Sequence, residues 1–120
     1  MLDTLKLIQR PNAPSLLDRA VTLYLQTAKD YLGRLQGLVS GANAAGVREA
    51  AHALKGSSGT VGAKRLAGLC KELEEMGRSG ELEGAAAKLR EVRAEFGRVE
   101  KSLSGVIGKE RAVNSKEAVA

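Results

Sequence analysis

The chain contains a single histidine, His52, in the stretch HALKGSSGTVGA, where a lysine, two serines and three glycines follow it. An imidazole has a reference pKa of about 6.5, so near pH 7 much of it is neutral and can act as a nucleophile. Glycine is among the weakest helix formers. The rest of the chain is rich in helix-forming residues. The first question is therefore what an imidazole next to glycines can do.

The helical phase of this stretch places His52 toward solvent. Successive residues of an α-helix are rotated by about 100°. The positions within about 40° of the side opposite the histidine are mostly apolar: Val47, Ala50, Leu54, Ser57 and Val61. These residues define the buried face. His52 is therefore not expected to be a core histidine.

The predicted exposed face around His52 combines cations with open space. Arg48, Lys55, Gly56 and Gly59 lie within about 60° of the histidine. Each glycine inside a helix costs about 1 kcal/mol relative to alanine, but it also removes a side chain from the surface. A nucleophilic nitrogen with clear space and nearby positive charge suits transfer of a phosphoryl group, which is negatively charged at neutral pH.

Two simpler interpretations of the same stretch stay open on these grounds. His52 could be an incidental surface histidine. Alternatively, Gly56 could be a helix C-cap, with GSSG forming a loop. A phosphate-binding loop is disfavoured, because Ala63 separates Gly62 from Lys64 and no strand precedes the stretch.

Apolar residues recur at helical spacing along most of the chain. A short helix is predicted over 2–9, and longer helices are predicted from Ser15, from Ala44, from Ala63 and over 82–106. The segments SGANAAG and GRSG supply turns. Short turns make consecutive helices antiparallel, so we predict an all-α fold, an antiparallel up-down four-helix bundle with a short N-terminal capping helix. We expect the domain to span 1–108 and 109–120 to form a flexible tail.

Composition argues against several classes of function. The 120 residues carry a net charge of +5 that is spread along the chain, and aromatic residues make up only 2%. We therefore do not expect a nucleic-acid partner, although a basic surface suits an acidic protein. No apolar run is long enough for a membrane span, and no signal peptide is recognisable.

The lone Cys70 excludes an internal disulfide and indicates a reduced, buried thiol in the cytoplasm. His52 and Cys70 alone do not make a metal site, so no metal is expected. No arrangement resembling a Ser-His-Asp hydrolase is visible either.

The segment AHALKGSSGTVGAKRL resembles the signature of histidine-containing phosphotransfer (HPt) domains of bacterial two-component phosphorelays. The flanking segments LLDRAVTLYLQTAKDYLGRLQ and LCKELEEMGRSG resemble the neighbouring helices of such domains. The resemblance covers about residues 2–106. The resemblance implies a helical bundle in which the histidine lies in mid-helix. On that basis, we expect the helix that contains His52 to continue through about Thr60.

The resemblance also implies roles for individual residues. His52 would be the phospho-acceptor, and Lys55 would help to hold the phosphoryl oxygens. Gly56 would leave room for the phosphorylated ring. The serines that follow, Ser57 and Ser58, would form local hydrogen bonds or orient the ring.

The docking surface and the partners follow from the same resemblance. Gly59 and Arg48 would belong to a flat face that docks the receiver domain of a response regulator, a hybrid sensor histidine kinase, or both. The receiver would supply the aspartate and Mg²⁺, so no intrinsic cofactor is expected. The chain would be a phosphocarrier without an ATP-binding or kinase catalytic domain, and a monomer. The alternative is a non-catalytic docking module that regulates a partner through the His52 face.

Overall fold

The computed structural model describes residues 16–119, with side chains described through residue 105. Over this range the chain forms four helices and no strand: α2 (Leu16–Ser40), α3 (Ala44–Thr60), α4 (Lys64–Ser79) and α5 (Ala85–Val119). The predicted short helix over 2–9 lies outside the described residues. The all-α prediction is confirmed.

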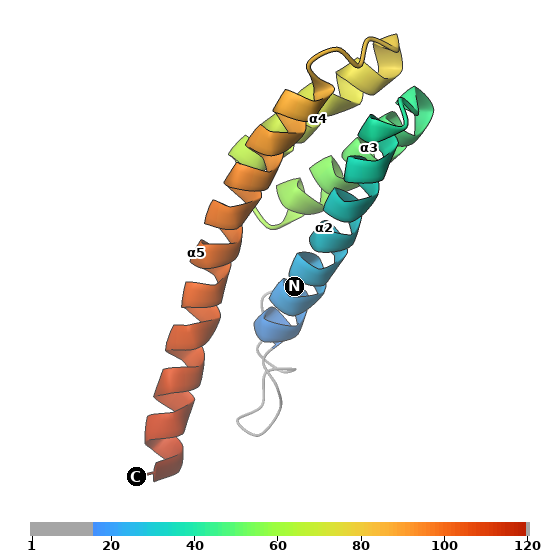
Figure 1. Cartoon of the computed structure of the whole chain (residues 1–120). Helices are drawn as coiled ribbons and strands as arrows, with labels where there is room; N and C mark the ends of the chain where they lie inside the picture. The colour runs from blue at the N-terminus through green and yellow to red at the C-terminus, as the bar shows by residue number, and fades with distance from the viewer. Residues whose placement is uncertain (1–15, 120) are drawn as a thin grey trace.

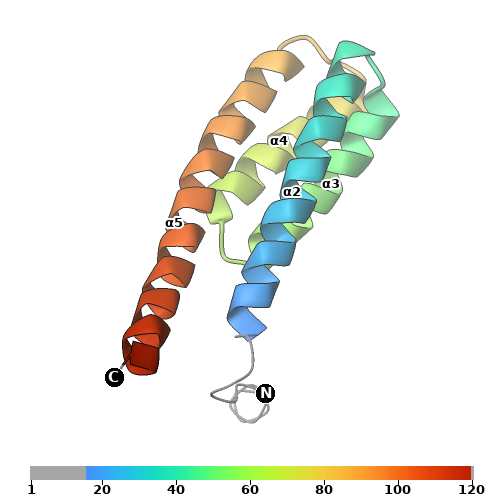
Figure 2. The ribbon, with the colours of Figure 1, turned by 60° about the horizontal axis from the view of Figure 1, so that its bottom comes forward.

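The four helices form a closed bundle. Each helix packs against the next one in the chain, and α5 also packs against α2, which closes the ring. The helices lie lengthwise beside one another (Figures 1 and 2). The ion pair between Lys29 of α2 and Glu100 of α5, at 2.6 Å, links the first and last helices. Because the connections are short, consecutive helices run antiparallel, as the sequence predicts.

The residues between the helices explain where each helix begins and ends. Asn43 is the N-cap of α3, and its side chain accepts a hydrogen bond from the Gly46 N–H at 2.9 Å. Gly62, between α3 and α4, and Gly80, after α4, both have positive φ, of 82° and 79°. Glycine adopts this conformation without steric cost. The sequence therefore ends α3 and α4 at defined points.

Helix α3 continues through both glycines beside the histidine and ends at Thr60. This is the end that the family resemblance implied. The loop alternative, in which Gly56 caps the helix, is wrong. His52 therefore lies near the middle of a regular helix.

Buried apolar side chains from all four helices form one core. Tyr24 of α2 and Phe96 of α5 meet in this core at a ring separation of 6.4 Å. Burial of this surface supplies most of the driving force for folding. The core residues are Tyr24, Ala28, Leu32 and Leu35 from α2; Val47, Ala50, Ala51 and Leu54 from α3; Leu66, Cys70 and Leu73 from α4; and Ala85, Leu89, Val92 and Phe96 from α5.

The backbones of helices α3 and α4 approach each other closely at Gly77. A Cβ atom at this position would lie 2.5 Å from the backbone nitrogen of Arg48 and 2.8 Å from the carbonyl oxygen of Ala44. Gly77 therefore lies inside α4 and allows close packing, while the helix ends two residues later, at Ser79. This close approach brings the side chains of α4 against the face of α3 that carries His52.

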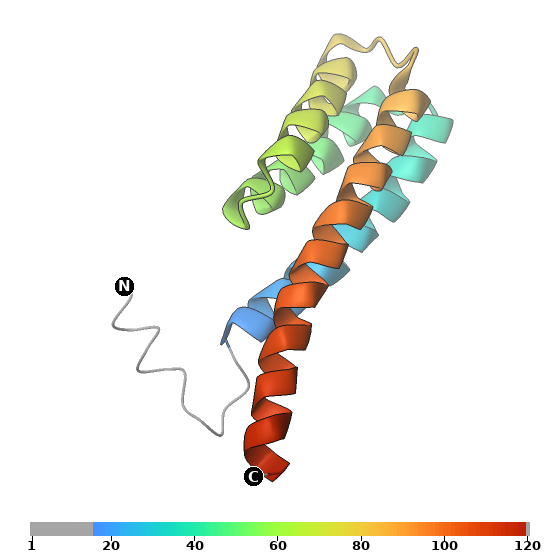
Figure 3. The same ribbon diagram turned by 90° about the vertical axis from the view of Figure 1, so that its left-hand side faces the viewer.

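Helix α5 begins at Ala85, three residues after the predicted start, and continues to Val119. Its C-terminal half extends past the connection between α3 and α4 (Figures 1 and 3). The helical backbone thus continues beyond Gly108, where the sequence pattern fades. The division into a domain over 1–108 and a flexible tail over 109–120 stays a prediction. Within the described residues, no helix has the length and apolar character required to cross a bilayer.

Candidate functional site

His52 lies on the exposed side of α3, as its helical phase predicts. Its side chain is 67% exposed. The opposite side of the helix is buried through Val47, Ala50 and Leu54. The buried face fixes the rotation of the helix and thereby directs the imidazole outward.

A buried glutamate on α4 holds one nitrogen of the imidazole. The Nδ1 atom of His52 lies 2.7 Å from Oε2 of Glu74, whose side chain is 4% exposed. An ionised carboxylate can only accept hydrogen bonds, so Nδ1 must carry the hydrogen. The neutral ring then has its lone pair on Nε2, which has no hydrogen-bond partner among residues 16–105.

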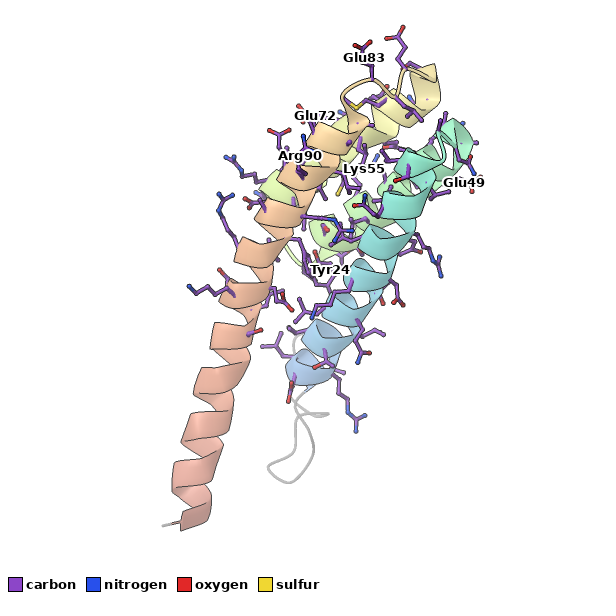
Figure 4. All side chains as sticks on the ribbon, viewed as in Figure 1. Tyr24, Glu49, Lys55, Glu72, Glu83 and Arg90 are labelled. Atoms are coloured by element: carbon purple, nitrogen blue, oxygen red, sulfur yellow. The ribbon has the colours of Figure 1, made fainter. Side chains whose placement is uncertain are left out.

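The same carboxylate binds Lys55. The Nζ atom of Lys55 donates a hydrogen bond to Oε1 of Glu74 at 2.6 Å. Lys55 lies one turn from His52 on α3 (labelled in Figure 4), and its side chain is 31% exposed. Lys55 is therefore beside the histidine, as predicted, but it is engaged by Glu74 rather than free.

The electrostatics of Glu74 are dominated by these partners. The hydrogen bond from Lys55 is the main cause that lowers the pKa of Glu74 below its ordinary value of 4.5, and the bond from His52 adds to it. Burial opposes the shift. The guanidinium of Arg78 lies 3.9 Å from Oε2. Glu74 is therefore an ionised carboxylate compensated by cations from both helices.

The surface beside the imidazole is open. A Cβ atom at Gly56 or Gly59 would meet nothing within 4 Å. A pocket of about 260 Å³ beside the ring is lined by Arg48, Glu49, His52, Glu74 and Arg78. Arg48 is exposed and forms no ion pair in the described part of the chain. The structure thus places the predicted glycines and Arg48 around the histidine.

The two serines have different surroundings. Ser57 donates a hydrogen bond to the carbonyl oxygen of Leu54 at 3.2 Å, so its bond is local, as predicted. Ser58 is fully buried and shares a 2.8 Å hydrogen bond with the hydroxyl of Tyr24 on α2. The expectation of a local bond for Ser58 is wrong, because helix phase turns this residue into the core. Neither serine forms a hydrogen bond with the imidazole.

The described residues contain no group of three or more His, Cys, Asp and Glu side chains that could hold a metal ion. Cys70 is buried in the core, and burial raises the pKa of its thiol to about 12. The thiol is therefore protonated at neutral pH and packs as an apolar side chain.

Two residues of the site, Glu74 and Arg78, were not predicted from the sequence. Glu74 follows Cys70 by four residues and Leu73 by one, so it falls on the apolar stripe of α4. A carboxylate on a buried face requires a partner. That position is the signal that could have identified Glu74, but the sequence does not show which helix provides the partner. Arg78 carries no comparable signal, because it lies on the exposed side of α4.

The comparison with protein families shows which family this chain belongs to. The model of the Hpt domain family matches residues 19–102. This chain belongs to the Hpt domain family. The structure is also similar to the crystal structure of histidine-containing phosphotransfer protein B (HptB) from Pseudomonas aeruginosa PAO1. The two chains are 32% identical and superpose with a TM-score of 0.74, over 75% of this chain and 78% of HptB. No curated protein sequence matches the chain.

Membership of this family establishes the general activity. Hpt domains take part in histidine phosphotransfer in phosphorelay signalling, and this chain does so as well. Proteins of this family are phosphocarriers and not kinases, and they interact with response regulators or sensor kinases.

Proposed function

We propose that His52 is the phospho-acceptor of this Hpt domain and exchanges a phosphoryl group with an aspartate of a receiver domain. One observation carries the proposal. The only histidine of the chain is exposed in mid-helix, and Glu74 binds its Nδ1 at 2.7 Å, which leaves Nε2 as the nucleophile.

The reaction follows from this geometry. The lone pair of Nε2 attacks phosphorus, the bond between phosphorus and the aspartyl oxygen breaks, and the aspartate leaves as a carboxylate. The hydrogen stays on Nδ1, so the phosphorylated ring gains a positive charge. The carboxylate of Glu74 stabilises this charge through the Nδ1–H bond. The reverse reaction returns the phosphoryl group to a receiver.

The remaining predicted residues support the transfer. Lys55 lies one turn from His52 and binds the same carboxylate, so we expect its flexible side chain to contact the phosphoryl oxygens. Gly56 and Gly59 allow a partner to approach the ring. Arg48 offers an exposed cation to an acidic partner surface. We expect Mg²⁺ to be bound by the receiver and not by this chain.

The partners in this proposal are a response-regulator receiver domain, a hybrid sensor histidine kinase, or both. The chain acts as a carrier without ATP binding of its own. Its monomeric state and its cytoplasmic location stay predictions.

A small-molecule donor tests the acceptor without any partner. The full chain is incubated with phosphoramidate, in which the P–N bond breaks and ammonia leaves, and the products are measured by intact mass. The wild type is expected to gain one phosphoryl group that is lost in acid and kept in alkali. His52→Gln is expected to gain none. Equal phosphorylation of both proteins would contradict the assignment of His52.

A further inference from the structure

The pocket beside the imidazole contains a carboxylate that the transfer reaction does not use. Glu49 lies three residues before His52 on α3 and lines the same pocket of about 260 Å³. Residues three apart on a helix are neighbours on one face, with about 5–6 Å between their Cβ atoms. Glu49 and Lys55, both labelled in Figure 4, therefore lie one turn before and one turn after the histidine.

No cation of its own helix compensates the charge of Glu49. The residues three and four positions away are Ala45, Gly46, His52 and Ala53. A residue on a helix surface meets its neighbours at these spacings. The side chain of Glu49 is exposed, and it forms no ion pair in the part of the chain whose side chains the structure describes. Glu49 is therefore an uncompensated carboxylate next to the nucleophile.

The charged groups that α4 contributes to this pocket are already paired. Glu74 binds a lysine of α3 at 2.6 Å, and the guanidinium of Arg78 lies 3.3 Å from the carboxylate of Glu75. Arg48, like Glu49, forms no ion pair among the described side chains. The uncompensated charges that line the pocket are therefore one cation, Arg48, and one anion, Glu49.

Phosphorylation of His52 brings a second anion to this position. A phosphoryl group carries about −1.5 to −2 charges at neutral pH, whereas the neutral imidazole carries none. Its repulsion by Glu49 raises the free energy of the phosphorylated chain and leaves that of the unphosphorylated chain unchanged. A free receiver domain does not experience this repulsion. Glu49 therefore shifts the exchange toward the phosphorylated receiver.

We propose that Glu49 tunes the phosphoryl-transfer equilibrium of His52: its charge destabilises the phosphorylated ring, which favours transfer of the phosphoryl group to a receiver. The inference rests on the proposed function of His52. In each transfer, the bond to phosphorus moves between Nε2 and the aspartyl oxygen, and the hydrogen stays on Nδ1. Glu49 forms and breaks no bond and acts through its charge alone.

Coulomb's law gives the size of the expected effect. For charges about 7 Å apart in water, repulsion of a phosphoryl group by one carboxylate changes the equilibrium constant about fourfold at an ionic strength of about 0.01 M. Screening reduces this change to about twofold at about 0.15 M. The dependence on salt distinguishes an effect of charge from a change in the shape of the site.

The test is the equilibrium constant for phosphoryl exchange between the full chain and one phosphorylated receiver domain, measured by intact mass at both ionic strengths. This constant depends only on the free species, so it does not report how the receiver docks. Glu49→Gln is expected to shift it toward the phosphorylated chain by about fourfold at about 0.01 M and about twofold at about 0.15 M. Glu49→Asp keeps the charge and is expected to stay near the wild type.

Two further variants check that the effect is local and electrostatic. Glu83→Gln removes the same charge from an exposed position between α4 and α5, outside this pocket, and is expected to leave the constant unchanged. Arg48→Gln removes the cation of the pocket and is expected to shift the constant in the opposite direction, toward the phosphorylated receiver.

The outcomes separate this inference from the proposed function. An unchanged constant in Glu49→Gln would overturn the inference, and so would an equal shift in Glu83→Gln or a shift of the same sign in Arg48→Gln. Each of these results leaves His52 as the acceptor. Failure of the wild type to accept a phosphoryl group from either phosphoramidate or the receiver would contradict the proposed function, and the inference with it.

Discussion

At the scale of single residues, the site is organised by Glu74. Its buried carboxylate determines which nitrogen of His52 is available and where Lys55 lies. The exposed residues around the ring provide access, whereas the glutamate provides orientation. Hydrogen bonds to a charged group of this kind are stronger than neutral ones.

The lowered pKa of Glu74 predicts a specific dependence of stability on pH. Since the carboxyl group binds a proton less readily in the folded state, its contribution to stability is present above pH 4.5 and is lost as the pH falls through the folded pKa. Glu74→Gln is expected to reduce the slope of unfolding free energy against pH in this acid range. Urea unfolding over a pH series measures the slope, with Glu72→Gln as the control. Identical slopes for Glu74→Gln and the wild type would contradict the account.

At the scale of helices, the glycines of α3 and α4 serve opposite purposes. Gly56 faces open solvent, whereas Gly77 faces the backbone of the neighbouring helix. One leaves a surface clear for a partner, and the other allows two helices to touch. Adding a side chain at Gly56 and at Gly77 distinguishes these two purposes.

Gly77→Ala is expected to destabilise the fold by about 1–3 kcal/mol, because the new methyl group would meet the backbone of α3. Gly68→Ala is the matched control in the same helix. A Cβ at Gly68 meets nothing within 4 Å, so alanine there is expected to stabilise the fold by about 0.5–1 kcal/mol. Thermal or urea unfolding measures both. A neutral Gly77→Ala variant would show that α3 and α4 do not require this close approach.

Gly56→Leu is expected to separate stability from function. The helix has room for the side chain, so the fold is kept or slightly stabilised. The leucine crowds the imidazole, so transfer from a phosphorylated receiver should slow by about tenfold or more. Gly97→Leu, at an open position on α5, controls for the added apolar surface. An unchanged transfer rate for Gly56→Leu would remove the explanation of this glycine.

At the scale of the whole molecule, the four-helix bundle could be predicted because apolar residues recur at regular helical spacing and the turns are short. The exposure of His52 followed from the phase of one helix. The end of that helix did not follow from propensity, because Gly56 and Gly59 favour a loop locally while packing of the opposite face maintains the helix. Glu74 was missed because the two residues that bind it most closely, His52 and Lys55, lie on another helix, and only the packing of α3 on α4 brings them together.

The predicted domain boundary can be tested by shortening the chain. A protein that ends at residue 108 keeps every core residue among the side chains that the structure describes, residues 16–105. It is expected to match the full chain within about 0.5 kcal/mol of unfolding free energy and to accept phosphate at the same rate. Circular dichroism during urea unfolding and a transfer assay measure the two properties. A marked loss of stability would place the end of the domain beyond residue 108.

The most direct test of the central claim is phosphoryl transfer from a labelled phospho-receiver to this chain, wild type beside His52→Gln, with receiver binding measured in parallel. We expect label on the wild type only, lost in acid and kept in alkali, while both proteins bind the receiver. Binding of several receivers without transfer to the wild type would contradict a relay at His52 and would favour a docking module.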